Sequence, residues 1–259
     1  MALTNKTIAS TYGDILQTSN SGSGRTANGT VVKDGLGQST ALTLGQNKLH
    51  VKPSTDQTDA VVMETASGTD LLVVDTSNSA VKAGTTQQYV NTQVKEFGAF
   101  DISPTADTHY AMVTMHGLNS TGAADWIPSS FGTGTDPATT YTLSSASEQF
   151  IPLLWYIPVA ITIDEVRVIA GSDAAANLNF HLFSYTMATG TSSGAGDLSS
   201  GALLAHNGSA LVTGDDRATT TTLTVDSANV VADKVVLAFV ESDGTDDVTA
   251  QLIVKYHYQ

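Results

Sequence analysis

The stretch GTDLLVVDTSNSAVKAG, residues 68–84, decides the fold class of the first part of this 259-residue chain. It reads as a short apolar strand, a four-residue polar turn and a second short strand. A two-stranded hairpin is at best marginally stable in water, because it has too little apolar surface to bury against itself. The sequence therefore predicts that this ribbon packs against further strands.

Short strands of this kind recur from residue 30 to residue 84, with turn residues between them. Their starts are spaced by 8 to 11 residues, which is typical of all-β proteins. The unit ALTL-GQNK-LHVK has the same strand, turn and strand pattern as LLVVD-TSNS-AVKA. These two units predict a short-strand β stem over residues 30–84. The expected strands are TVVK (30–33), ALTL (41–44), LHVK (49–52), AVVME (60–64), LLVVD (71–75) and AVKA (80–83).

A helix is predicted directly after the stem, in TTQQYVNTQVKEF (85–97). Val90, Val94 and Phe97 follow one another at i, i+4 and i+7, and Gly98 is a natural stop. A segment of about three turns is too short to be stable alone, so it would need partners. We expect residues 85–98 to form a short helical neck at the domain boundary.

The remaining residues, 99–259, contain longer strands separated by Gly- and Ser-rich loops. The alternation in ITIDEVRVIA (161–170) slips by one residue at Asp164-Glu165, which predicts a β-bulge. Asp243-Gly244 is the strongest hairpin signal in the chain. The pattern predicts an antiparallel β-sandwich head of jelly-roll type. Further expected strands are LNFHLFSY (178–185), TTLTVD (221–226), VVLAFVES (235–242) and DVTAQLIVKYHYQ (247–259).

Charge is distributed unevenly along the chain. Residues 1–95 hold 7 Lys and Arg against 7 acidic residues, whereas residues 96–259 hold 4 against 18 and carry the whole net charge of −14. An acidic body repels nucleic acid and anionic lipid, so neither is an expected partner. The neutral first third is the part expected to contact other protein, with chance drift in surface charge as the alternative.

Composition excludes several classes of chemistry and predicts a protein that does not insert into membranes. There is no Cys, which rules out disulfides, thiolate metal sites and a Cys nucleophile. The start lacks the pattern of a secretory signal, so we expect synthesis without Sec-type export. The longest apolar run (150–163) is shorter than the ~18 to 20 residues of a membrane span and is interrupted by Pro152 and Pro158.

Sequence motifs for catalysis or metal binding are weak. GTSSG (190–194) matches the G-x-S-x-G pattern around Ser192, but it lies in a low-complexity loop with no helix after it. The six His residues show no paired ligand spacing, and ESDGTDD (241–247) lacks the spacing of an EF-hand. We therefore expect no enzyme activity, no cofactor and no metal, although turn carboxylates holding a divalent cation remain an alternative.

The two tryptophans of the chain are candidates for stacking on sugars. Trp155 lies in a strongly apolar run and is expected in the core, whereas Trp126 is flanked by polar residues and is the candidate for ligand binding.

The N-terminal residues 1–29 are expected to form an attachment arm. Their apolar residues have the spacing of a helical face and are followed by the flexible stretch SNSGSGRTANG (19–29). An amphipathic tip on such an arm suits docking into a larger body, and a terminus folded back on its own domain is the alternative. The apolar residues are Ile8, Tyr12, Ile15 and Leu16.

The first third of the chain resembles a known family. TIASTYGDILQTSN (7–20), VVKDGLGQSTALTLGQNKLHVKP (31–53) and GTDLLVVDTSNSAVKAG (68–84) resemble the N-terminal segment of virion fibre and decoration proteins of tailed bacteriophages, especially those of marine bacteria. The resemblance implies a non-enzymatic homotrimer on the virion surface. Its arm would attach to capsid or tail proteins, its strands would form an intertwined stem, and its sandwich would face outward.

The residues themselves favour the same assembly, since strands of four or five residues cannot enclose a core within one chain. Leu71, Val73 and Val81 are expected to face neighbouring copies, with Leu72 and Val74 packed under adjoining strands. The runner-up function is a carbohydrate-binding adhesin that recognises a host-surface glycan; a third, a glycan depolymerase, has little room in this chain. The full set of candidate assembly residues is Ile8, Tyr12, Ile15, Leu16, Leu71, Val73, Val81, Val90, Val94 and Phe97.

Overall fold

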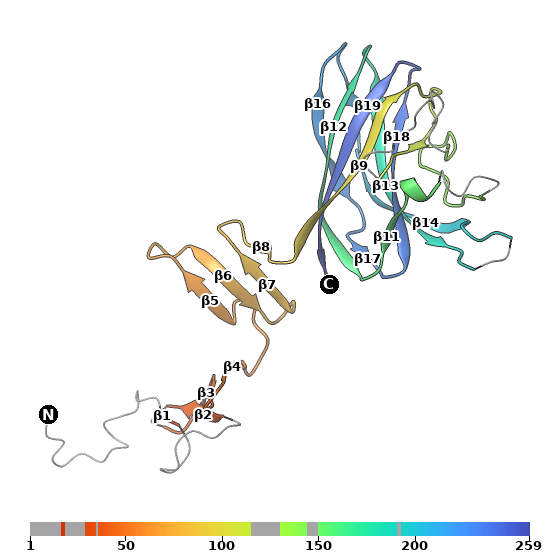
Figure 1. Ribbon diagram of the computed structural model, residues 1–259. Coiled ribbons are helices and arrows are strands. Elements are labelled where there is room, and N and C mark those ends of the chain that lie inside the picture. The colour runs from red at the N-terminus through yellow and green to blue at the C-terminus, as the bar shows by residue number, and fades with distance from the viewer. Residues whose placement is uncertain (1–16, 19–28, 35, 115–129, 144–149, 191–192) are drawn as a thin grey trace, which may run out of the picture. The chain divides into compact units, whose positions relative to one another are not determined.

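The computed structural model describes residues 17–18, 29–34, 36–114, 130–143, 150–190 and 193–259. The chain forms two compact units, Met1–Val90 and Asn91–Gln259. The described part is nearly all β, and its one helical element is the short 3₁₀ turn η1 (Ile151–Leu153) (Figure 1). The all-β fold class is therefore confirmed, and each unit is described separately below.

The first unit contains two four-stranded antiparallel sheets, and each of the six short strands expected from the sequence is present. The strands follow chain order in both sheets, and short turns join β3 to β4 and each of β5 to β8 to the next. The opening ribbon is the hairpin β6–β7, flanked by β5 and β8. The first sheet consists of β1 (Gln17–Thr18), β2 (Thr30–Lys33), β3 (Ser39–Leu44) and β4 (Leu49–Val51). The second consists of β5 (Val61–Glu64), β6 (Asp70–Asp75), β7 (Ala80–Ala83) and β8 (Gln88–Tyr89).

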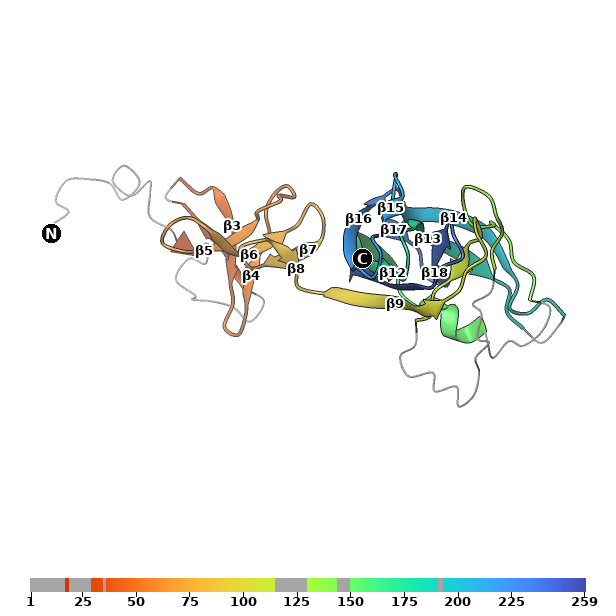
Figure 2. The same ribbon diagram turned by 90° about the horizontal axis from the view of Figure 1, so that it is seen from above.

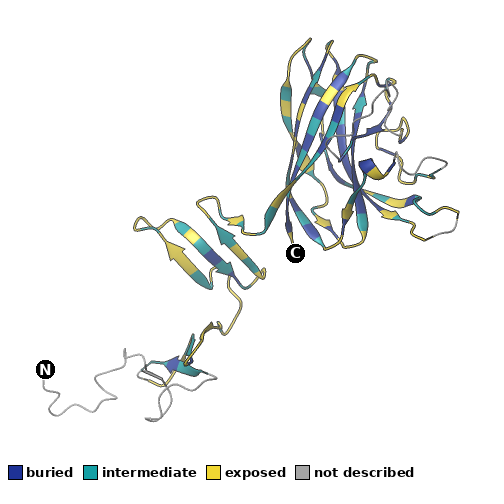
Figure 3. Cartoon of the chain, in the orientation of Figure 1, coloured by how far each residue is buried: buried dark blue, intermediate teal, exposed yellow. Residues whose placement is uncertain are grey.

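The first unit has almost no hydrophobic core of its own. Within residues 29–34 and 36–90, the only buried hydrophobic side chains are those of Val32 and Val73. Figure 3 shows the strands of this unit mainly in the colours of intermediate and exposed residues. In a single chain the other described hydrophobic side chains of these two sheets are therefore half-buried or exposed.

The second unit is a jelly roll. One sheet has the strand order β9-β19-β12-β16 and the other β10-β18-β13-β14. Among these eight strands the chain passes from one sheet to the other at every step except from β13 to β14, which is the order of the double Greek key. Its strands are β9 (Thr92–Ile102), β10 (Tyr110–Ala111), β11 (Trp155–Ile157), β12 (Ile161–Ser172), β13 (Asn177–Met187), β14 (Leu198–His206), β15 (Leu211–Val212), β16 (Thr219–Val225), β17 (Asn229–Val230), β18 (Lys234–Ser242) and β19 (Val248–Tyr258).

The two sheets also join along both of their sides. On one side β14 pairs with β16, through Ala205 and Val225, and on the other Gly98 of β9 pairs with Val113 just after β10. The sandwich is thus closed around its core, as the end-on view of Figure 2 shows. Closure leaves these eight strands without a free hydrogen-bonding edge over the joined segments.

The second unit has two hydrophobic cores, because both faces of one sheet are covered. On β13 the side chains of Phe180 and Leu182 point between the sheets, whereas Phe183 and Tyr185 belong to a separate cluster on the outer face. Alternation along a strand sends successive side chains to opposite faces. The outer cluster is covered by the described parts of the connection from β10 to β11, which contribute Phe131, Phe150 and Leu153.

The predicted helix at 85–97 is wrong. Residues 92–102 form β9, which pairs with β19 from Thr92 to Ile102. The spacing of Val94 and Phe97 places them on opposite faces of this strand, and accordingly Val94 is exposed while Phe97 is fully buried. A short segment without stable helix content of its own takes the conformation that pairing with a neighbouring strand offers.

The predicted hairpin at Asp243-Gly244 is also wrong, although the strands on both sides are correct. β18 pairs with β10 and β13, whereas β19 pairs with β9 and β12, so the turn carries the chain from one sheet to the other. The Asp243 carboxylate accepts hydrogen bonds from the backbone and side chain of Asn177 at the start of β13. The bulge expected near Asp164 is confirmed by a register shift between Ile163 and Glu165.

Candidate assembly surfaces and the buried histidine pair

The second sheet of the first unit gathers six apolar side chains on one face. Residues paired directly across antiparallel strands lie on the same face. Val74 of β6 pairs with Val61 on one side and Val81 on the other, and Leu72 pairs likewise with Met63 and Ala83. None of these six residues is charged, and Met63 and Val81 are 59% and 37% exposed. We call this set, Val61, Met63, Leu72, Val74, Val81 and Ala83, the stem face.

The opposite face of the same sheet, which we call the polar face, carries paired charged side chains besides the apolar Val62, Leu71 and Val73. Lys82 and Asp75 form an ion pair at 3.0 Å, with the Asp75 side chain fully buried. Asn78 donates hydrogen bonds to the Asp75 carboxylate from its side chain at 2.8 Å and its backbone at 2.9 Å. These donors, led by the Asn78 side chain, lower the pKa of Asp75 to about 2. The polar face thus fixes the β6–β7 turn, while the stem face has no such partners.

Replacing Asp75 with asparagine is expected to remove an acid-dependent part of the stability of this sheet. The carboxyl has a pKa of about 2 when folded and about 3.9 when unfolded. The ionised form is therefore favoured in the fold, and its contribution is present above about pH 4 and lost as the pH falls toward 2. Thermal unfolding between these pH values should show a steeper loss in the wild type than in Asp75→Asn. The control is Asp59→Asn, at an exposed residue, which should lose stability as the wild type does. If the wild type and Asp75→Asn lose the same stability on acidification, the stabilising role of the Asp75 carboxylate is contradicted.

The first sheet of this unit also places apolar side chains together on one face. Leu42 and Leu44 of β3 pair with Val51 and Leu49 of β4, so these four apolar side chains share one face. Leu49 is 65% exposed. The two strand-turn-strand units of the sequence therefore each produce a sheet with one uncharged apolar face that a single chain does not bury.

The structure separates the residues that the sequence grouped for assembly. Leu71 and Val73 lie on the polar face, while Val81 shares the stem face with Leu72 and Val74, so the expected common face of Leu71, Val73 and Val81 is wrong. A period of two along each strand could not reveal this, because the register across the turn decides which residues meet.

The remaining candidate residues fall in different places. Val90 is exposed at the end of the first unit, and Val94 is exposed on β9 of the second. Phe97 belongs to the core of the second unit, where its ring meets Trp155 at 6.2 Å between centroids. The other candidates lie outside the described residues. They are Ile8, Tyr12, Ile15, Leu16 and Trp126, together with Ser192 of the G-x-S-x-G motif.

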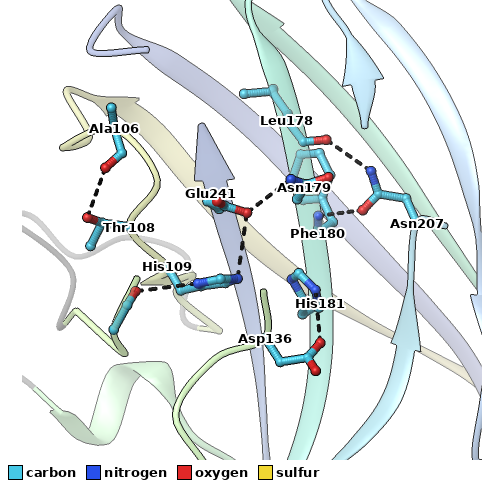
Figure 4. A network of polar contacts seen from close by, with 11 residues as sticks. Ala106, Thr108, His109, Asp136, Leu178, Asn179, Phe180, His181, Asn207 and Glu241 are labelled. Carbon is cyan, nitrogen blue, oxygen red and sulfur yellow. Dashed lines mark hydrogen bonds and ion pairs between the residues drawn. The ribbon is translucent and has the colours of Figure 1, made fainter. Parts of the chain in front are cut away.

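The second unit contains a buried histidine pair that the sequence did not indicate (Figure 4). His109, just before β10, and His181, on the outer face of β13, have ring centroids 4.9 Å apart. Both side chains are almost completely buried. His109 Nδ1 lies 3.4 Å from the Gly132 carbonyl oxygen, and its Nε2 lies 3.7 Å from Glu241 Oε2. His181 Nε2 lies 3.5 Å from Asp136 Oδ1.

Burial keeps this pair neutral near pH 7. Loss of solvation lowers the pKa of both rings, and for His181 the neighbouring His109 and His206 add to this effect and bring the pKa to about 3. Two of the ring nitrogens, His109 Nε2 and His181 Nδ1, are buried without a hydrogen-bond partner among the described residues. The described part of the chain holds no group of three or more His, Cys, Asp or Glu side chains placed to bind a metal ion.

Comparison with known proteins assigns no family. No protein-family model matches the chain, and no curated protein matches it in sequence. Among solved structures, "Structure of infectious bursal disease virus Gx strain" aligns with 68% of this chain and 34% of its own, at 10% identity and a TM-score of 0.26. This chain thus spans about a third of the length of that one. So low a TM-score carries no argument, and the jelly-roll assignment rests on this chain's own strand order. In the described part, no helix has the length and apolarity to cross a membrane.

Proposed function

We propose that this chain is a non-enzymatic structural protein of a phage virion, a fibre or decoration protein whose copies associate as a homotrimer. The first unit would form the shared stem, and the jelly roll would be displayed outward. The observation that carries the proposal is the stem itself, two sheets whose only buried hydrophobic residues among those described are Val32 and Val73. Sheets this small require a partner to bury their apolar faces.

Charge supports association through the first unit rather than the second. Residues 1–90 contain 6 basic and 7 acidic residues, for a net charge of −1, whereas residues 91–259 contain 5 and 18, for −13. Two jelly rolls brought together would repel each other, and two first units would not. The stem face is uncharged, so identical copies can meet on it without opposing like charges.

The virion context and the threefold state rest on the resemblance of residues 7–84 to phage fibre and decoration proteins. That resemblance also supplies the partner for the N-terminal arm, a capsid or tail protein. A jelly roll is an architecture that viral capsid proteins and lectins both use, so the fold agrees with outward display without selecting a ligand.

Sedimentation of the full chain at micromolar concentration is expected to give a particle of three 26.9 kDa copies. The physical reason is that the stem faces are buried only in the assembly. A stable, fully folded monomer at this concentration would overturn the proposal. Microscopy of the virion with the labelled protein would then show whether it sits on the head or on the tail.

A further inference from the structure

The buried histidine pair lies where residues 130–143 dock on the jelly roll. Phe131 donates its backbone N–H to the His109 carbonyl at 2.8 Å, and His109 donates its own to the Gly132 carbonyl at 2.9 Å. Farther along the segment, the Tyr185 hydroxyl donates to the Ala138 carbonyl at 2.9 Å. Residues 130–143, the docked segment, thereby cover part of the aromatic cluster on the outer face of β13 and β18.

Hydrogen bonding determines which nitrogens carry protons when both rings are neutral. The Gly132 carbonyl can only accept, so the proton of His109 is on Nδ1. The Asp136 carboxylate, 3.5 Å from His181 Nε2, can also only accept, so this contact favours the proton of His181 on Nε2. The nitrogens left without a proton, His109 Nε2 and His181 Nδ1, are the two ring nitrogens of this pair that are buried without a hydrogen-bond partner among the described residues. Acid must therefore add its protons at these two atoms.

The two positions differ in what they offer to a new proton. His109 Nε2 faces the Glu241 carboxylate at 3.7 Å, which can compensate a positive charge. His181 Nδ1 faces no acceptor among the described residues, so a proton there would be a buried donor left unpaired.

The charged and titratable groups around His181 do not relieve this. Asp136 of the docked segment already contacts Nε2, and its side chain is 56% exposed. His206 of β14 lies with its ring 6.2 Å from His181 and pairs with Asp226 at 2.7 Å. A proton on His181 would therefore lie beside the rings of His206 and His109, and both lower the pKa of His181 further.

We propose that His109 and His181 form an acid-sensitive latch, which holds the docked segment at neutral pH and releases it in mildly acidic surroundings. Release would uncover the aromatic side chains that lie beneath the segment. These side chains are Phe183, Tyr185 and Phe239. The latch lies within one jelly roll and does not depend on the trimer.

The direction of the pH dependence follows from proton linkage. In the released state His181 has its ordinary pKa of about 6.5, whereas burial holds the pKa to about 3 in the docked state. The released state therefore binds more protons between these values, and docking weakens as the pH falls below about 6.5. From about pH 7.5 to about pH 4.5 the release constant should rise on the order of 100-fold for this one histidine.

Hydrogen exchange of the full chain tests the latch at the backbone amides of Phe131 and Ala138, which are bonded to the His109 and Phe131 carbonyls. After correction for the intrinsic pH dependence of exchange, their protection should fall on the order of 100-fold between about pH 7.5 and about pH 4.5. The variant His181→Phe keeps an aromatic ring but cannot take a proton, so its protection should change less than about tenfold. His257→Gln, in the other sheet, is the matched control and should behave as the wild type.

Two results would overturn the latch. One is unchanged protection of these amides in the wild type across the pH range, and the other is a full loss that persists in His181→Phe. If His181→Phe does not fold at neutral pH, NMR titration of the histidines in the wild-type protein tests the latch instead. The latch requires that His181 stays neutral while the segment is docked, so a docked His181 titrating near pH 6.5 rejects it.

Discussion

Phe180→Ala is expected to lower the free energy of unfolding of the jelly roll by about 3–5 kcal/mol. The Phe180 side chain is fully buried on β13, in the core between the two sheets. Alanine would leave a cavity there, and strands tied on both sides, by β14 and β18, cannot move together to fill it. Denaturant unfolding of the full chain, followed by far-UV circular dichroism, measures the loss.

The matched control is Phe100→Ala, which removes the same atoms from a residue that is 82% exposed on β9. Its effect should remain within about 0.5 kcal/mol, as is usual for surface substitutions. Similar losses in the two variants would mean that the core does not lie between the two sheets as described. A loss below about 1 kcal/mol for Phe180→Ala would lead to the same conclusion.

Local sequence pattern was sufficient for most strands but not for the way they combine. Alternating apolar residues bounded by turn residues identified the six stem strands and the bulge at Asp164. The same reasoning failed at Val94 and Phe97, because their spacing with Val90 matches a helix, whereas pairing with β19 makes the segment a strand and leaves Val94 exposed. It failed at Asp243, because a turn signal does not specify which strands pair across it.

The candidate sites show this limit more sharply. The stem face could be recognised as apolar, but only the pairing of Val74 with Val81 showed which residues belong to it. His109 and His181 lie far apart in the sequence and meet because the connection after β10 folds over the outer face of the sheet. No local sequence pattern predicts that residues 130–143 cover this face, because their polar, Gly- and Thr-rich sequence resembles an ordinary surface loop.

Met63→Glu is expected to reduce the native mass of the protein from three copies to one. Met63 is 59% exposed in the single chain, so a glutamate there does not disturb the fold of its own sheet. In the proposed trimer the same position is buried on the stem face, where an unpaired carboxylate costs about 3 kcal/mol or more for each chain. Three such charges around one axis also repel one another, so sedimentation at micromolar concentration should show monomers.

The neighbouring residue provides the control, because Val62 lies on the other face of the same strand. Val62 is 37% exposed and pairs with Val73, whose other partner is Lys82, so a glutamate there joins a face that already holds charges. Val62→Glu should therefore remain trimeric while Met63→Glu does not. If both variants dissociate, both faces of the sheet are covered in the assembly. If Met63→Glu stays trimeric, the copies do not meet through the stem face, and the first unit must bury its apolar surface in another way.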